Sequence, residues 1–565
     1  MKKYSGFSAK TVLLIASVTV LVSCNDSWKE HYSYKTDSSY PVDKIDVTLE
    51  GIEGYENFYA ALENTYLYDK DGNRYKDNQS FLDLLNQDQF ITVWAPSNES
   101  VSKEQWKIYM DPNKSDSLNY EVGEKFLKMH IARFKHTVGD VDTSKVFMLN
   151  GKPVVSTPAA MGGQPYHGTD KNIRCLNGVL HCLDGNIKFL PNIYEYITTS
   201  PDYRDILGDW YKSYTKEEVD QANSIASGID ENGEKIWIDA VIIESSILMR
   251  EYGFINSEDS TYNFLLPERN LWIEQYNRIK DYFVYNESKT NNDSLQKFYT
   301  YCAMMTDMCF NMNGKIQRHY PDSVFSTPYN SSENRREKKP YHVFAYPEDA
   351  VNGVFGSAQQ EIECSNGKIF IINKWPFADT LTFLRDIKLE AEDYRDLPSL
   401  FAVAQRSVNK IGRDTLKQAV RVMRILSAGG ENYWDNGARF YIKDNLKGKY
   451  SIKVIVSPNT EEDNKPCLFH PIVLYAGEKL YDSTITYWDT VAGMVIPITE
   501  EYLLSGSSTK IDTLEIAVVD IPYSAYDMKS SPLAVELYSR VNTSSTETYS
   551  GEIWLDGIVL EPVVE

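Results

Sequence analysis

A repeated order of short motifs constrains the fold of this chain more than any other feature. In residues 91–106, the alternating segment ITVWAPSNES contains a Pro and a polar turn, and a helical pattern follows it through Trp106. Residues 262–272, YNFLLPERNLW, repeat that order. Alternation before a Pro predicts a strand that ends there, and Pro favours the turn or first helical position that follows.

Each copy continues with an Asn-Gly pair ahead of an apolar strand. The two segments are LNGVLHCLDGNIKFLPNIYEYI at 176–197 and SNGKIFIINKWPFADTLTFL at 365–384. Asn-Gly supplies the positive φ values that a tight turn needs. Because the copies are separated by about the length of a domain, the sequence predicts two tandem domains and not a solenoid.

Three motifs of the first copy resemble the fasciclin-like domain. ITVWAPSNES is similar to its first signature, KFLKMHIARF with His130 to its Tyr-His segment, and NGVLHCLDGNI with His181 to its second signature. The resemblance implies an α+β domain over 41–199 that closes on NIYEYI, with a structural role for His181. The second copy, 200–386, keeps the strand and Asn-Gly motifs but shows no counterpart of the Tyr-His segment.

The last third of the chain, 387–565, changes to short strands separated by Gly, Asn, Asp and Pro. A basic stretch at 409–424 is predicted to be helical, and the strands after it include YSIKVIVSP, DTLEIAVVD and EIWLDGIVLEPV. This spacing predicts an all-β sandwich, and LEAEDY with IWLDGIVLEPV resembles galactose-binding-like jelly rolls. The predicted fold is multidomain: two α+β fasciclin-like domains followed by an all-β jelly-roll sandwich.

Residues 1–23 predict a secretory signal peptide. Three lysines precede TVLLIASVTVLV, an apolar run too short to cross a bilayer comfortably. The LVSC box that ends in Cys24 resembles the bacterial lipoprotein signal. The resemblance implies lipid, palmitate included, on the Cys24 thiol and a mature chain that begins there; a chance Cys after an ordinary signal is the alternative. Residues 24–40 predict a polar tether.

The tether and the net charge bear on location and partners. Asp26 and Glu30 resemble a signal for display on the outer face of the outer membrane in glycan-foraging bacteria, although a solvated linker explains the same residues. The formal charge of −22 repels nucleic acid and anionic headgroups. We therefore predict no nucleic-acid partner and a membrane partner reached through the lipid anchor.

Catalytic and metal-binding patterns are not found. The sequence lacks GxSxG, HExxH, P-loop and GxGxxG motifs, and no Cys/His set has zinc spacing. We predict a protein that is not an enzyme and needs no cofactor, with the six later cysteines as mostly buried small hydrophobes. In the resembled jelly rolls, a glutamate near Glu390, Glu392 and Asp393 can contribute to a structural calcium site; a solvated strand edge is the alternative.

Two aromatic segments form the predicted ligand site. ENYWDNG places Tyr433 and Trp434 beside Asp435, and TYWDT places Tyr487 beside Trp488. An exposed aromatic ring stacks on a sugar face while neighbouring Asn and Asp groups hydrogen-bond its hydroxyls. The alternative is that these Trp side chains plug the ends of the sandwich.

The predicted function is a non-catalytic cell-surface lipoprotein for adhesion or for binding an extracellular glycan or protein. This follows from the resemblance, because fasciclin-like domains commonly serve adhesion. The alternative is an accessory subunit of an outer-membrane nutrient uptake complex, held to a transporter by protein contacts.

Overall fold

The chain is multidomain, with mixed α and β structure and many β-sheets. It divides into two compact units, Met1–Pro191 and Asn192–Glu565. The computed structural model describes residues 41, 43–68, 74, 78–139, 143–219, 225–229, 233, 235–239, 242–286, 292–313, 322–326, 342–392, 398–401, 404–412, 419–427, 436–461, 464–482, 488–489, 494–495, 503–528, 530–541 and 545–564.

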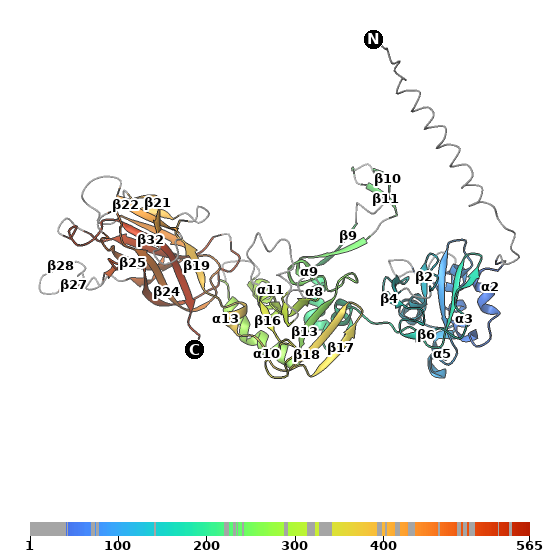
Figure 1. Cartoon of the computed structure of the whole chain (residues 1–565). Helices are drawn as coiled ribbons and strands as arrows, with labels where there is room; N and C mark the ends of the chain where they lie inside the picture. The colour runs from blue at the N-terminus through green and yellow to red at the C-terminus, as the bar shows by residue number, and fades with distance from the viewer. Residues whose placement is uncertain are drawn as a thin grey trace, which may run out of the picture. The chain divides into compact units, whose positions relative to one another are not determined.

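A four-stranded sheet in the order β2-β1-β8-β7 organises the first unit, and its two central strands are parallel. The strands are β1 (Ile91–Pro96), β2 (Ile131–Arg133), β7 (Ile173–Cys175) and β8 (Gly178–Leu183). Helices beside the sheet include α2, α3 and α5 (Figure 1). The helices are α2 (Ile45–Glu50), α3 (Glu56–Glu63), α4 (Phe81–Leu85), α5 (Lys103–Met110), α6 (Asp116–Lys125) and η2 (Leu127–His130).

The core of this unit lies between the helices and the sheet, where Phe58 and Trp106 pack with Val93 and Leu180. A second four-stranded sheet, in the order β3-β4-β5-β6, follows the first along the chain. Its strands are β3 (Ser144–Phe147), β4 (Pro153–Ser156), β5 (Ala160–Met161) and β6 (Gln164–Pro165).

The second unit begins with a part that repeats the first sheet in the order β14-β13-β18-β17. The strands are β13 (Tyr262–Pro267), β14 (Cys309–Asn311), β17 (Gln360–Cys364) and β18 (Gly367–Ile372). The helices are α7 (Ile193–Thr199), η3 (Arg204–Gly208), α8 (Asp209–Ser213), α9 (Ile247–Tyr252), α10 (Arg269–Ile279), η4 (Lys280–Phe283), α11 (Asn292–Met305) and α13 (Asp379–Thr382). Short strands complete it: β9 (Thr215–Val219), β10 (Ile225–Ile229), β11 (Lys235–Asp239), β12 (Ile242–Ser246), β15 (Ser323–Phe325) and β16 (Val343–Ala345).

The Asn-Gly pairs explain why the two copies share a topology. Asn177 Oδ1 accepts from the backbone N–H of Ile45 at 3.0 Å, and Asn366 Oδ1 accepts from that of Ile193 at 3.0 Å. Both asparagines are buried, and each amide donates to two backbone carbonyls. The glycine that follows allows close strand approach, since a Cβ at Gly178 would lie 1.9 Å from a neighbouring carbonyl oxygen.

The equivalence of these two asparagines corrects one predicted boundary. In the first copy, Asn177 binds the start of α2, the first helix of that copy. Asn366 binds the start of α7 in the same way, so the NIYEYI segment opens the second copy and does not close the first. The predicted boundary at 199/200 therefore moves to 191/192.

The last part of the second unit holds two six-stranded antiparallel sheets. The first contains β19 (Ile387–Glu390), β21 (Ala404–Gly412), β22 (Ala419–Ser427), β24 (Gly448–Ser457), β30 (Asp512–Ile521) and β32 (Ile553–Pro562). The second contains β20 (Ser399–Phe401), β23 (Gly437–Tyr441), β25 (Leu468–Tyr475), β26 (Glu478–Asp482), β29 (Leu504–Ser505) and β31 (Leu533–Ser539). Their inward side chains, Ile452 and Val535 among them, join one apolar core, which makes this part a sandwich.

The predicted helix at 409–424 is wrong, because its described residues lie in β21 and β22. The two strands pair antiparallel from Ala404–Ser427 to Gly412–Ala419. Backbone groups that a helix would satisfy by itself are satisfied here by the pairing of the two strands. Tertiary pairing thus overrides a modest helical preference.

The apolar core of the second unit runs from its α+β part into the sandwich, so these two predicted domains form one compact unit. Of the six cysteines after Cys24, five are buried, as predicted, and Cys302 is partly exposed. Within the described ranges, no helix is long and apolar enough to cross a membrane.

Candidate binding site

The side chains of the predicted ligand site lie outside the described part of the chain. Tyr433, Trp434, Asp435 and Tyr487 fall in undescribed segments, as does the predicted lipidation residue Cys24. The backbone of Trp488 belongs to β27 (Trp488–Asp489), which pairs antiparallel with β28 (Met494–Val495). The strands that flank these segments in sequence are described.

Described residues at or near the two predicted segments lie in one row across a sheet. Gly437, the first residue of β23, pairs with Tyr538 of β31, which pairs with His470 of β25. His470 Nε2 lies 2.8 Å from Oδ1 of Asp482, the last residue of β26. ENYWDNG ends at Gly437, and TYWDT begins at Thr486, four residues after Asp482. We call Gly437, Tyr538, His470 and Asp482 the Tyr538 row.

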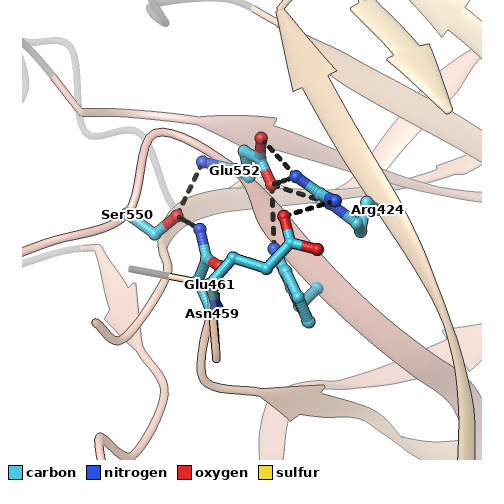
Figure 2. Close-up of polar contacts among 6 residues, drawn as sticks. Arg424, Asn459, Glu461, Ser550 and Glu552 are labelled. Atoms are coloured by element: carbon cyan, nitrogen blue, oxygen red, sulfur yellow. Dashed lines mark hydrogen bonds and ion pairs between the residues drawn. The ribbon is translucent and has the colours of Figure 1, made fainter. Parts of the chain in front are cut away.

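Arg424 lies near the end of β22, which runs into the first predicted segment. Its Nε and Nη2 donate to the two carboxylate oxygens of Glu552 at 2.9 Å, and its Nη1 lies 2.8 Å from Glu461 Oε2 (Figure 2). The guanidinium carbon lies 4.9 Å from the centroid of the Trp554 ring, and Trp554 Nε1 donates to Glu552 at 2.9 Å. Bidentate geometry of this kind fixes both partners.

Ser550 and Asn459 complete this group of polar side chains. Together with Arg424, Glu461, Glu552 and Trp554, we call them the Arg424 cluster. Ser550 Oγ accepts from the Glu552 N–H at 3.1 Å and from Asn459 Nδ2 at 2.9 Å (Figure 2). Asn459 Oδ1 accepts from the N–H of Glu461 at 3.0 Å. The side chain of Glu461 is 54% exposed, whereas those of Arg424 and Glu552 are 16% and 15% exposed. The cluster therefore holds the Glu461 carboxylate in solvent next to Arg424 of β22.

The Tyr538 row holds charged and polar groups on the face of its sheet that points away from the core. Alternate residues, such as Leu537 of β31, belong to the core. Arg540 Nη2 donates to His470 Nδ1 at 3.0 Å, so His470 is the neutral tautomer that donates from Nε2 to Asp482. Burial lowers the pKa of His470, against the raising effect of Asp482.

A buried carboxylate continues this face next to the row. Glu536 accepts from Arg439 Nε and, at 3.0 Å, from the hydroxyl of Tyr538. Burial and the bond to Glu536 raise the pKa of Tyr538 to about 12. Tyr538 also packs against a small apolar cluster that contains Ile472 and Leu474. An apolar platform with a few fixed polar groups is the composition of a small-ligand site.

Sequence reasoning missed the polar residues that flank the two segments. The sequence carries a signal for them: LAVELYSR has Glu536 inside the apolar strand β31 and Arg540 directly after it, and LFHPIVLY has His470 inside the apolar strand β25. Charges at alternate positions of such a strand indicate a polar face opposite the core. Only the strand register shows that these polar residues lie close together at one end of the sheet.

A cavity of about 240 Å³ lies at the opposite end of β25, beside Tyr475 and Asn286. The serine hydroxyls in its lining serve the fold, since Ser524 Oγ donates to Asn445 O and accepts from the Tyr526 N–H. We therefore place the candidate site at the end with the Tyr538 row.

The two signature histidines of the first unit are buried and hydrogen-bonded. His130 Nδ1 donates to Phe126 O at 2.8 Å, and its Nε2 accepts from the Ile187 N–H at 3.0 Å. The His181 ring stacks on Trp94 with centroids 5.4 Å apart. Burial lowers the pKa of both histidines to about 4. In the second copy the register places buried Met308 where the first has His130, which accounts for the missing Tyr-His motif.

Metal-ligand geometry is not found in the described ranges, where no group of three or more His, Cys, Asp or Glu side chains could hold an ion. Glu390 ends β19, and Asp393 of the predicted calcium cluster lies outside the described residues. The calcium site stays a prediction.

No protein-family model matches this chain, and no curated protein matches it in sequence. Solved structures similar to parts of it include a FAS1 domain pair from the insect cell adhesion molecule fasciclin I, with 12% identity, a TM-score of 0.18, and coverage of 58% of this chain and 99% of that one. The CBM35 module from Paenibacillus barcinonensis has 9% identity, a TM-score of 0.17, and coverage of 31% and 98%. A mannan-recognising carbohydrate-binding module has 9% identity, a TM-score of 0.19, and coverage of 32% and 99%. At these TM-scores the similarities assign neither a family nor a function.

Proposed function

We propose that this chain is a non-catalytic lipoprotein, anchored through Cys24 to the outer membrane and displayed at the cell surface. It binds an extracellular glycan or a protein through the end of its sandwich. In this proposal the two α+β fasciclin-like parts serve adhesion and carry the sandwich, a galactose-binding-like jelly roll. Tyr433, Trp434 and Asp435 of one segment and Tyr487 and Trp488 of the other contact the ligand.

One observation carries the proposal: Gly437, which ends the first aromatic segment, and Asp482, which precedes the second in sequence, lie in one row across the sheet. Arg424 and Glu552 fix the strand that leads into the first segment. Arg540 donates to His470, and His470 donates to Asp482, the last described residue before the second segment. Buried ion pairs contribute little net stability compared with apolar packing, so their concentration here supports a positioning role.

The test is an array of glycans and extracellular proteins probed with the soluble chain from Asn25. Trp434→Ala and Trp488→Ala are the test variants, and Tyr120→Ala is the matched control, since Tyr120 is an exposed aromatic of the first unit. We expect binding that either Trp variant abolishes and the control retains. Binding that survives both Trp variants contradicts the proposed site, and an array without any binding favours the uptake-complex alternative.

A further inference from the structure

Three exposed apolar side chains lie along one end of the sheet in the first unit. Phe134 follows β2, Phe90 precedes β1, and Leu176 lies in the turn between β7 and β8; they are 71%, 53% and 53% exposed. The Phe134 N–H donates to Phe90 O at 2.7 Å, and the next residue, Ile91, donates to Asn177 O at 3.1 Å. The three side chains therefore adjoin neighbouring strand ends, and we call them the Phe134 edge.

The backbone holds Phe134 in a conformation that is costly for a bulky side chain. Its φ is 68°, in the left-handed region that favours glycine. The buried Thr92 fixes this geometry, because its Oγ1 donates to Phe134 O at 2.8 Å and accepts from the His136 N–H at 2.8 Å. The Phe134 ring is exposed although its backbone is strained. The strained conformation therefore does not serve to bury this ring in the core.

Charge at this end differs from that of the chain as a whole, which carries −22. The Lys135 ammonium lies 4.0 Å from the centroid of the Phe90 ring, in cation–π geometry. Arg133 and Lys135 flank Phe134 in sequence, Arg174 lies two residues before Leu176, and Lys44 Nζ lies 2.8 Å from Asp88 Oδ1. Basic side chains therefore adjoin the exposed apolar residues, although the chain as a whole is acidic.

The described chain also begins at this end. Ile45 starts α2 and donates its N–H to Asn177 Oδ1 at 3.0 Å, and the Leu176 N–H donates to Asp43 O at 2.8 Å. Residues 24–40, the predicted tether, directly precede this point. The Phe134 edge is therefore the end of the unit at which the chain arrives from the predicted lipid on Cys24.

We propose that the Phe134 edge is a membrane-contact surface, whose aromatic rings enter the headgroup region when the chain is anchored. The inference rests on the lipid anchor of the proposed function and adds a second contact to it. Exposed Phe and Leu beside Lys and Arg are the composition of interfacial membrane-binding surfaces. A lipid anchor keeps the edge at a high local concentration near the bilayer, so a weak contact suffices.

The test couples the mature chain through the Cys24 thiol to vesicles of phosphatidylethanolamine with a minor share of phosphatidylglycerol. Amide hydrogen exchange is then compared on and off the vesicles for peptides that span Phe90 and Phe134. The test variant combines Phe90→Ser with Phe134→Gly, because glycine removes the ring and tolerates the positive φ. The control is Phe147→Ser, which removes a 50% exposed ring of β3.

We expect exchange in both peptides to slow severalfold on vesicles for the parent and the Phe147 control, and to stay at the free-chain rate for the double variant. Added salt should have little effect on this slowing of exchange, because the Phe90 and Phe134 rings dominate the contact with the membrane. Unchanged exchange on vesicles, or equal slowing in the double variant, overturns the inference. Chemical coupling makes this result independent of lipidation in cells and of the ligand array, so a failure here is distinct from a failure of the proposed function.

Discussion

The buried histidines predict that the first unit loses stability in mild acid. Burial lowers the pKa of His130 and His181 from 6.5 to about 4, so both are neutral in the folded unit at pH 7. A base with a lowered folded pKa contributes full stability above pH 6.5 and loses it as pH falls toward 4. At about 1.4 kcal/mol per pKa unit, protonation of each histidine costs about 3 kcal/mol of unfolding free energy below pH 4 and about 2 kcal/mol at pH 5.

The combined loss of about 4 kcal/mol at pH 5 is a large share of a domain's stability. The assay is urea unfolding of residues 41–191, followed by tryptophan fluorescence between pH 7.5 and pH 5. Hydrogen bonds lower the pKa of Glu56, Asp88 and Asp116, so these carboxylates contribute to acid loss mainly at lower pH.

The double variant His130→Gln with His181→Gln separates titration from packing. Gln keeps a hydrogen-bond donor and an acceptor but loses the packing of the ring, so the variant should be less stable at pH 7.5. Because Gln does not titrate, the unfolding free energy of the variant should change less with pH. His167→Gln is the control, since His167 is an exposed histidine of the same unit. A wild-type unit equally stable at pH 7.5 and pH 5, or a double variant that keeps the full loss of stability in acid, would show that the two histidines do not cause this loss.

Three other predictions concern packing and polar contacts. Asn366→Ala leaves buried backbone groups without partners and should lower the unfolding free energy by about 2–4 kcal/mol, measured by hydrogen exchange in β18. Gly178→Ala puts a Cβ 1.9 Å from Ile91 O and should cost about 3 kcal/mol in urea unfolding, whereas Gly51→Ala, with 3.6 Å to its nearest contact, should cost under about 0.5 kcal/mol. Glu536→Gln leaves Arg439 without its carboxylate and should lower thermal stability by about 1–3 kcal/mol; an unchanged melting temperature counts against the buried pair.

Local patterns predicted those elements whose residues carry the signal themselves. Alternation before Pro predicts β1 and β13, and the Asn-Gly pairs at Asn177 and Asn366 predict the turns before β8 and β18. These positions need particular residues, because only an asparagine side chain can bind the helix start there while a glycine admits the neighbouring strand. The strand-rich part was predictable for the same reason.

The errors arose where distant contacts decide the structure. NIYEYI has the same local pattern at the end of one domain as at the start of another, and only the bond from Ile193 to Asn366 assigns it. The 409–424 stretch becomes two strands because each pairs with the other. His470 and Asp482 are 12 residues apart and meet because β25 pairs with β26, and the register of β25 with β31 and of β31 with β23 adds Tyr538 and Gly437 to the same row.

In the proposed function, both aromatic segments contribute to one ligand site at the end of the sandwich. The decisive measurement is a double-mutant cycle with Trp434→Ala and Trp488→Ala, made by titration calorimetry with a ligand from the array. If both rings contact one ligand, their effects couple by about 1 kcal/mol or more. Losses that add to within about 0.3–0.5 kcal/mol would contradict a shared site.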